Sequence, residues 1–97
     1  MNEYRGGLRW GGGSFGQTNV SYPFAKLSIG RGEIILSTLN EEFTLTPTEV
    51  TSISQKNRIL YKGIVFHHTN SALPRILVFW TFESKKILSD LDSYFLG

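Results

Sequence analysis

The sequence predicts a mostly β domain that ends in one α-helix. Valine, isoleucine and threonine together number 20 among the 97 residues, whereas alanine numbers only 2. β-Branched side chains lose rotamer freedom in a helix and pack well on a pleated surface, so this composition favours strands. Short segments of alternating apolar and polar residues, separated by turn residues, indicate about seven antiparallel strands, and only the last segment has a helical period.

Composition also limits the possible functions. A chain of 97 residues makes one small domain with little room for an enclosed catalytic cavity. The net charge of +2 predicts no nucleic-acid partner and no strong attraction to anionic membranes. Without cysteine there is no disulfide, thiolate nucleophile or cysteine-based metal site, and we expect no cofactor. The longest apolar runs have about five residues, far fewer than the 18 or so that span a bilayer. The first twenty residues lack a signal-peptide segment, so we expect a cytoplasmic protein, with a membrane-peripheral placement as the alternative.

Residues 1–21 are predicted to form a glycine-rich N-terminal arm, and residues 22–97 the folded domain. Six of the ten glycines lie between Gly6 and Gly16, and backbone entropy opposes a fixed conformation there. The segment 4–10 alternates well enough to add an edge strand, with 11–16 as a flexible loop. Three aromatic side chains of this arm offer apolar area for docking on a partner: Tyr4, Trp10 and Phe15.

Alternating segments separated by turn residues define the expected strands of the domain. The strands are expected over 24–29, 33–39, 43–46, 50–55, 59–69 and 75–82. The main turns are expected at 30–32, 40–42 and 56–58. Thr46-Pro47-Thr48-Glu49 has the pattern of a capping box with proline at the first helical position, which predicts one helical or turn-like step.

The last two strands and the C-terminal helix supply the expected core. Segment 75–82 is apolar on both faces, which predicts a strand covered on both sides. Apolar residues from 87 to 95 recur with the period of an amphipathic helix, which Thr81 or Ser84 can cap and Gly97 can end. Trp80 and Phe82 are expected to seat this helix. The expected core residues are Ile64, Phe66, Val78, Trp80, Phe82, Ile87, Leu91 and Phe95.

This order of elements, together with several local segments, resembles the pleckstrin-homology-like (PH-like) superfold, in particular its small bacterial and GRAM-like members. The resemblance covers about residues 22–96 and rests on Tyr22-Pro23-Phe24-Ala25-Lys26-Leu27, segment 43–50, Gly63-Ile64-Val65-Phe66-His67-His68, Val78-Phe79-Trp80 and the closing helix. It implies a partly open barrel of two near-orthogonal sheets, plugged at one end by the helix. It also implies binding of phosphoinositide head groups, peptides or protein domains, or a role in assembly, rather than catalysis.

Two motifs that suggest other chemistries lack the context that those chemistries need. Gly11-Gly12-Gly13-Ser14-Phe15-Gly16 fits the G-x-G-x-x-G pattern, but no preceding parallel strand or following helix is expected for a nucleotide site. His67 and His68 are neighbours on one strand and point to opposite faces, so they cannot chelate one metal ion together. His68 is expected to form hydrogen bonds at the barrel rim, while His67 points outward. The residues therefore predict no catalytic site and no metal site.

The densest basic cluster is the candidate contact for an anionic ligand. It consists of Lys56, Arg58 and Lys62 beside Tyr61. Basic residues next to an aromatic ring can contact phosphate, although a charged turn is more often only solvated. We expect a non-enzymatic interaction module that acts by protein–protein contact or self-association, with homo-oligomers among its possible states. The alternative is a peripheral membrane or lipid head-group binding module that uses this cluster.

Overall fold

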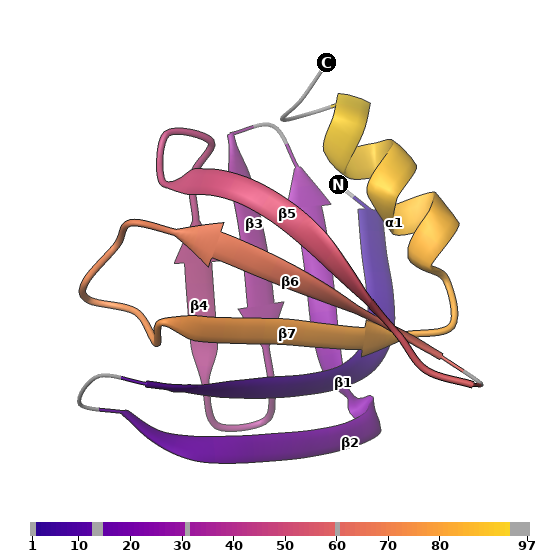
Figure 1. The fold of residues 1–97 in the computed structure, drawn as a ribbon, viewed down its shortest axis with the longest axis horizontal. Helices are drawn as coiled ribbons and strands as arrows, with labels where there is room; N and C mark the ends of the chain where they lie inside the picture. The colour runs from indigo at the N-terminus through magenta and orange to yellow at the C-terminus, as the bar shows by residue number, and fades with distance from the viewer. Residues whose placement is uncertain (1, 13–14, 31, 60, 94–97) are drawn as a thin grey trace.

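The computed structural model describes residues 2–12, 15–30, 32–59 and 61–93, and within these ranges it contains seven strands and one helix. The strands are β1 (Asn2–Gly12), β2 (Phe15–Gly30), β3 (Glu33–Ser37), β4 (Glu42–Leu45), β5 (Val50–Asn57), β6 (Lys62–His68) and β7 (Ile76–Thr81), and the helix is α1 (Ser84–Leu91). They form one antiparallel sheet in the order β4-β3-β2-β1-β7-β6-β5, which curls into a half-barrel with α1 beside it (Figure 1). The prediction of a mostly β domain with a short C-terminal helix is confirmed.

Strand β1 lies in the middle of the sheet, so the prediction of an edge strand within an arm is wrong. It pairs with β2 on one side and with β7 on the other, and its Leu8 and Trp10 belong to the core. Its glycine content follows from close packing and not from flexibility. Residues 13–14 of the expected flexible loop lie outside the described residues.

The sheet bends at Gly6 and Gly7 of β1. Gly6 pairs with Ala25 and Leu8 pairs with Val20, so four residues of β2, 21–24, bulge opposite Gly7. A Cβ on Gly6 would lie 2.2 Å from the Trp80 carbonyl oxygen, and one on Gly7 would lie 2.7 Å from the Val20 oxygen. No larger residue fits without a shift, because real Cβ atoms do not approach other atoms so closely. This bend turns the two halves of the β1–β2 hairpin toward different parts of the sheet.

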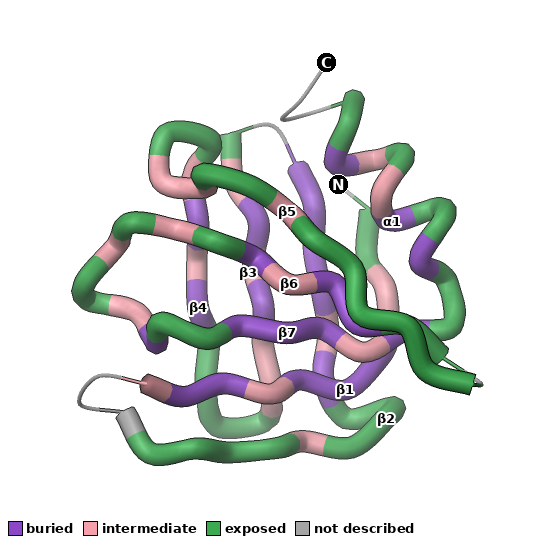
Figure 2. Tube along the Cα trace, in the orientation of Figure 1, coloured by how far each residue is buried: buried purple, intermediate pink, exposed green. Residues whose placement is uncertain are grey.

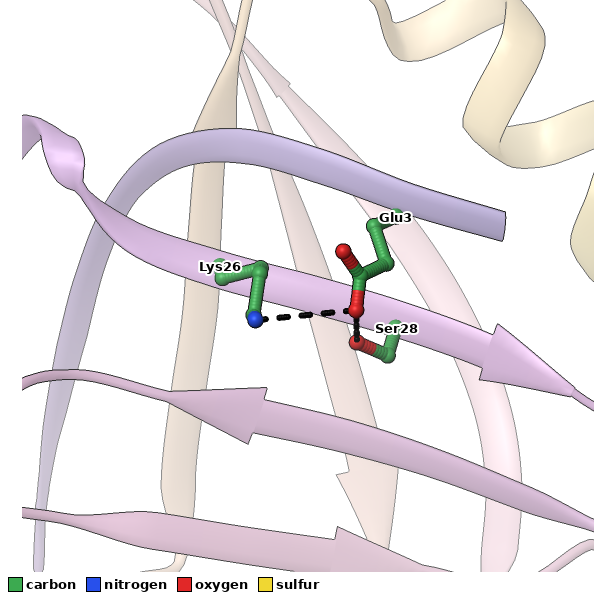
Figure 3. A network of polar contacts seen from close by, with 3 residues as sticks. All are labelled: Glu3, Lys26 and Ser28. Atoms are coloured by element: carbon green, nitrogen blue, oxygen red, sulfur yellow. Dashed lines mark hydrogen bonds and ion pairs between the residues drawn. The ribbon is translucent and has the colours of Figure 1, made fainter. Parts of the chain in front are cut away.

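Before the bend, polar contacts add to the pairing of β1 with β2. Glu3 of β1 accepts a hydrogen bond from Ser28 Oγ at 3.5 Å and lies 3.5 Å from Lys26 Nζ (Figure 3). The Lys26 and Glu3 side chains are substantially exposed, so this ion pair contributes little to stability.

The core fills the concave face of the half-barrel, between the sheet and α1. Of the predicted core residues, Ile64, Phe66, Ile87 and Leu91 are buried in this core, and Phe95 lies outside the described residues. Val78 is also buried, but it lies on the convex face opposite Arg9. Figure 2 shows buried stretches along β1, β3 and β7, whereas β5 and the first half of β2 are mainly exposed.

Two more of the predicted core residues lie elsewhere. Phe82 is 59% exposed, and Trp80 is half-buried on the convex face, so neither seats the helix. Side chains alternate along a strand, and in β7 it is Leu77 and Phe79 that face the core. The prediction chose the wrong face of this strand.

The turns follow the sequence pattern closely, with one displacement. The Glu49 N–H donates to the Thr46 carbonyl oxygen at 3.0 Å, which closes the expected turn-like step. Strand β5 continues to Asn57, so the next turn is not at 56–58 but follows it, closed by the Arg58 N–H donating to the Tyr61 oxygen at 3.0 Å.

Helix α1 is tied to both neighbouring strands. The Glu83 N–H donates to Thr81 Oγ1 at 2.9 Å just before the helix, but the N-cap residue is Glu83 and no side chain caps the helix, so the predicted cap by Thr81 or Ser84 is wrong. Later in the helix, Asp90 accepts hydrogen bonds from the Tyr4 hydroxyl and, at 2.9 Å, from Asn2 Nδ2. These contacts join the start of β1 to the helix, which lies beside it in Figure 1.

Candidate binding site

A pocket of about 480 Å³ lies on the convex face, at the bend of the sheet. Its position follows from strand alternation, because Gly7, Arg9 and Trp80 occupy the face opposite to the core residues Leu8 and Phe79. The pocket is lined by Gly7, Arg9, Asn19, Val20, Ser21, Tyr22, Arg58, Tyr61, Trp80, Thr81 and Phe82. The β2 bulge and the β5–β6 hairpin therefore both contribute to it. We call it the aromatic pocket.

Four aromatic rings form a connected series along this pocket. Tyr22 packs edge-to-face on Phe82 with ring centroids 5.1 Å apart, and Tyr61 packs on Trp80 at 5.3 Å and on Phe82 at 6.2 Å. Such T-shaped contacts are favourable because the positive edge of one ring meets the negative face of another. Tyr22 and Phe82 remain 52% and 59% exposed, so much of their apolar surface is open to a ligand.

The Trp80 ring lies over a glycine of the neighbouring strand. Gly63 is the cross-strand partner of Trp80, and a Cβ on Gly63 would come within 2.6 Å of the indole ring. The glycine therefore leaves the space that the indole occupies. On its other side Trp80 pairs with Gly7, which also lacks a side chain.

Two arginines give the aromatic pocket a positive charge. The Arg58 guanidinium carbon lies 5.3 Å from the Trp80 ring centroid, a cation–π contact. Arg9, in the central strand β1, is half-buried between its partners Asn19 and Val78. Neither arginine forms an ion pair with any residue that the structure describes, and no carboxylate is among the lining residues.

The predicted anionic-ligand residues divide between the two faces of the β5–β6 hairpin. Arg58 and Tyr61 line the pocket. Lys56 pairs with Gly63 and so shares the convex face without lining the pocket. Lys62 pairs with Thr81, whose side chain is buried on the other face. The sequence cluster is therefore not one contact surface.

The predicted partner-contact residues are used inside the molecule instead. Tyr4 binds Asp90 of α1, and Trp10 is only 8% exposed and packs edge-to-face on Phe43 at 5.3 Å. Both lie on the concave face of β1, which explains why neither is available for docking. The side chain of Phe15 lies outside the described residues.

The histidines lie away from the aromatic pocket and have partners. His68 Nε2 donates to the Pro74 oxygen at 2.7 Å, while its Nδ1 accepts from the Asn70 N–H at 3.1 Å, which fixes one tautomer. His67 Nε2 lies 2.9 Å from Ser54 Oγ. In the described part of the chain no three His, Cys, Asp or Glu side chains group as a metal site would require.

The glycine-rich motif connects two antiparallel strands, β1 and β2. A dinucleotide or phosphate loop needs a strand followed directly by a helix, whose N-terminus receives the phosphate. This hairpin has no such geometry.

Comparison with known proteins gives no matching family model, no matching curated protein and no matching solved structure. Within the described residues, α1 is too short to cross a bilayer. The aromatic pocket is therefore the feature of the molecule that points to a function.

Proposed function

We propose that this chain is a non-enzymatic interaction module of the PH-like kind, which binds a protein partner through the aromatic pocket. The observation that carries the proposal is the convergence of Tyr22, Tyr61, Trp80 and Phe82 with two arginines around one pocket. Tyrosine, tryptophan, phenylalanine and arginine are the residues enriched at protein interfaces, and tryptophan, tyrosine and arginine dominate their binding energy.

The lining chemistry supports binding without catalysis. General acid–base chemistry needs a group that gains and loses a proton near neutral pH, most often histidine or a carboxylate. The lining consists of arginines, aromatic residues, glycine, valine and neutral polar side chains, and Thr81 Oγ1 already accepts a backbone hydrogen bond.

The free edge of β2 favours a self-associating form of the same proposal. Residues 15–20 pair with β1, and among the described residues no second strand pairs with them. This segment contains no charged residue, whereas natural edge strands are commonly protected by charge. Sedimentation velocity over a range of protein concentrations tests this form: a dimer that is lost in Thr18→Lys supports it, and a monomer at all concentrations contradicts it.

Selection of phage-displayed random peptides on the immobilised protein tests pocket binding. Enriched peptides should bind about tenfold or more weakly to Tyr61→Ala and Phe82→Ala, because truncating central aromatic contacts costs more than about 1 kcal/mol. The matched control is Leu39→Ala, which removes a 92% exposed apolar side chain in the turn between β3 and β4. The proposal fails if no peptide is enriched, or if Leu39→Ala weakens binding equally.

A second candidate function follows from Ile59 at the tip of the β5–β6 hairpin. Ile59 is 100% exposed and lies among Lys56, Arg58, Tyr61 and Lys62. Lys62 lies on the other face of this hairpin, so the three basic residues together contribute at most about 3 kcal/mol at an anionic surface. One inserted isoleucine adds about 2 kcal/mol, and we therefore expect weak membrane binding. Co-sedimentation with phosphatidylcholine vesicles, with and without phosphatidylserine, measures it. Saturable, salt-sensitive binding that Ile59→Ser abolishes would favour the membrane function over the protein-binding one.

A further inference from the structure

Arg9 and Arg58 are the two charged side chains that line the aromatic pocket, and neither forms an ion pair with a described residue. Arg9 is half-buried in the central strand, and within the described residues it has no carboxylate within ion-pair distance. Partial burial of a charge costs free energy unless an opposite charge or hydrogen bonds compensate for it. A ligand that supplies an anionic group to the aromatic pocket would provide that compensation.

We propose that the aromatic pocket recognises an acidic side chain that stands next to a large apolar side chain in an extended protein segment. This inference rests on the proposed function and names the chemistry of the partner. The carboxylate binds Arg9 and Arg58, and the apolar side chain packs on the exposed faces of Tyr22 and Phe82.

Arg58 is suited to this role by its contact with Trp80. The cation–π contact restrains the guanidinium over the ring and leaves its fork of N–H donors for a ligand. A planar guanidinium matches a carboxylate through two parallel hydrogen bonds, and its prior restraint reduces the entropy lost on binding.

The surroundings of the pocket favour a protein segment. Lysine is not among the lining residues, whereas aromatic rings border the pocket along the β2 bulge and the β5–β6 hairpin. The lining segment 19–22 overlaps the free edge of β2, which spans residues 15–20. An extended segment can therefore continue past the pocket along this edge, which favours an acidic side chain over a chain-terminal carboxylate.

Three fluorescent peptides provide the test. The first has a Glu-Phe pair at its centre and is acetylated and amidated at its ends, and the second replaces that glutamate with glutamine. The third contains the Gln-Phe pair and a free C-terminal carboxylate next to a terminal phenylalanine. We expect the Glu-Phe peptide to bind about tenfold more tightly than the other two, as hydrogen bonds to a charged group contribute that much.

Variants of the protein locate the source of this preference. Arg58→Gln and Arg9→Gln should each reduce the preference for glutamate over glutamine several-fold, while the Gln-Phe peptide still binds. Lys62→Gln is the matched control, because it removes one positive charge from the same hairpin on the opposite face. Thermal unfolding midpoints, measured for every variant, separate loss of the contact from loss of the fold.

Each outcome discriminates between the inference and the proposed function. Equal binding of all three peptides, abolished by Phe82→Ala, would overturn the inference and leave the proposed function standing. Tighter binding of the third peptide would assign the carboxylate to a chain terminus and overturn the inference. If Lys62→Gln loses as much of the preference for glutamate over glutamine as the two arginine variants do, the preference reflects the overall positive charge, and the inference is overturned. If no peptide binds but vesicles with phosphatidylserine bind through Arg58, both proposals fail in favour of a lipid surface.

Discussion

The two faces of β7 differ although both are apolar in sequence. On the concave face Leu77 and Phe79 are completely buried, whereas on the convex face only Val78 is buried, Ile76 is 38% exposed and Trp80 is half-buried at the aromatic pocket. The concave face is covered by the rest of the half-barrel and α1, while around Trp80 the convex face is only bordered by a bulge and a hairpin. An apolar strand can thus supply the core with one face and a binding surface with the other.

The largest expected effect of this difference between the faces is on the free energy of unfolding, and Phe79 and Phe82 test it. Phe79→Ala should lower the free energy of unfolding by about 3–5 kcal/mol, as truncation of a fully buried aromatic side chain does. Phe82→Ala should change it by no more than about 1 kcal/mol, because that ring is mostly exposed. Urea unfolding of the two variants measures both values. Similar losses in the two would remove the distinction between the faces.

A smaller effect is expected from the glycines of the β1–β2 hairpin. Gly6→Ala should destabilise the protein by about 1–3 kcal/mol, because the new methyl group would overlap the Trp80 oxygen and the Phe79 ring. Gly16→Ala is the matched control, since nothing lies within 4 Å of its Cβ position. We expect it to be neutral or slightly stabilising, as alanine restricts the unfolded chain more than glycine does. Equal unfolding curves for the two variants would show that the bend does not require Gly6.

The elements that depend on local patterns were predictable from the sequence. Alternation located the strands after residue 24, Gly30 and Gly32 flanked the first predicted turn, and the helical period located α1. The central position of β1 was not predictable in this way. Its partner β7 lies about 70 residues further along the chain, and a glycine-rich segment contains no local signal for a pairing at such a distance.

The candidate site was predictable only where its residues are close in sequence. Arg58 and Tyr61 belong to one basic and aromatic cluster, and both line the aromatic pocket. Arg9 and Tyr22 reach the pocket through the pairing of distant strands and through the bulge of β2, which no periodicity indicates. For Trp80 and Phe82, an apolar pattern on both faces of β7 could not show which face meets the core.

The hydrogen bond between Tyr4 of β1 and Asp90 of α1 provides a further test on the concave side of the sheet. Tyr4→Phe removes the hydroxyl that donates to Asp90 and should reduce stability by about 1–2 kcal/mol, as expected for a partly buried hydrogen bond to a charged acceptor. Peptide binding at the aromatic pocket should not change, because Tyr4 lies on the opposite face. Differential scanning calorimetry gives the first quantity and fluorescence anisotropy the second. A loss of peptide binding at unchanged stability would contradict this separation of the faces.

Glu49 differs from the two arginines of the aromatic pocket in how its charge is compensated. Its carboxylate has hydrogen-bond partners within the protein, whereas Arg9 and Arg58 form no ion pair with a described residue. Its carboxylate accepts hydrogen bonds from the Thr46 N–H and Thr46 Oγ1, both at 2.9 Å, and from the Asn70 side chain. These bonds, led by the one from the Thr46 backbone, lower the pKa of Glu49 below its ordinary value of 4.5.

The smallest expected effect is therefore a pH dependence at Glu49. A carboxyl group whose pKa is lower in the folded than in the unfolded protein stabilises the fold above its unfolded pKa, and this contribution disappears as pH falls through the folded pKa. The difference in unfolding midpoint between the natural chain and Glu49→Gln should thus be constant above pH 4.5 and shrink below it. Glu41→Gln, which removes an exposed carboxylate from the turn before β4, serves as the control. A difference that persists unchanged well below pH 4.5 would show that the charge of Glu49 does not stabilise this turn, and that its hydrogen bonds act equally well on a neutral side chain.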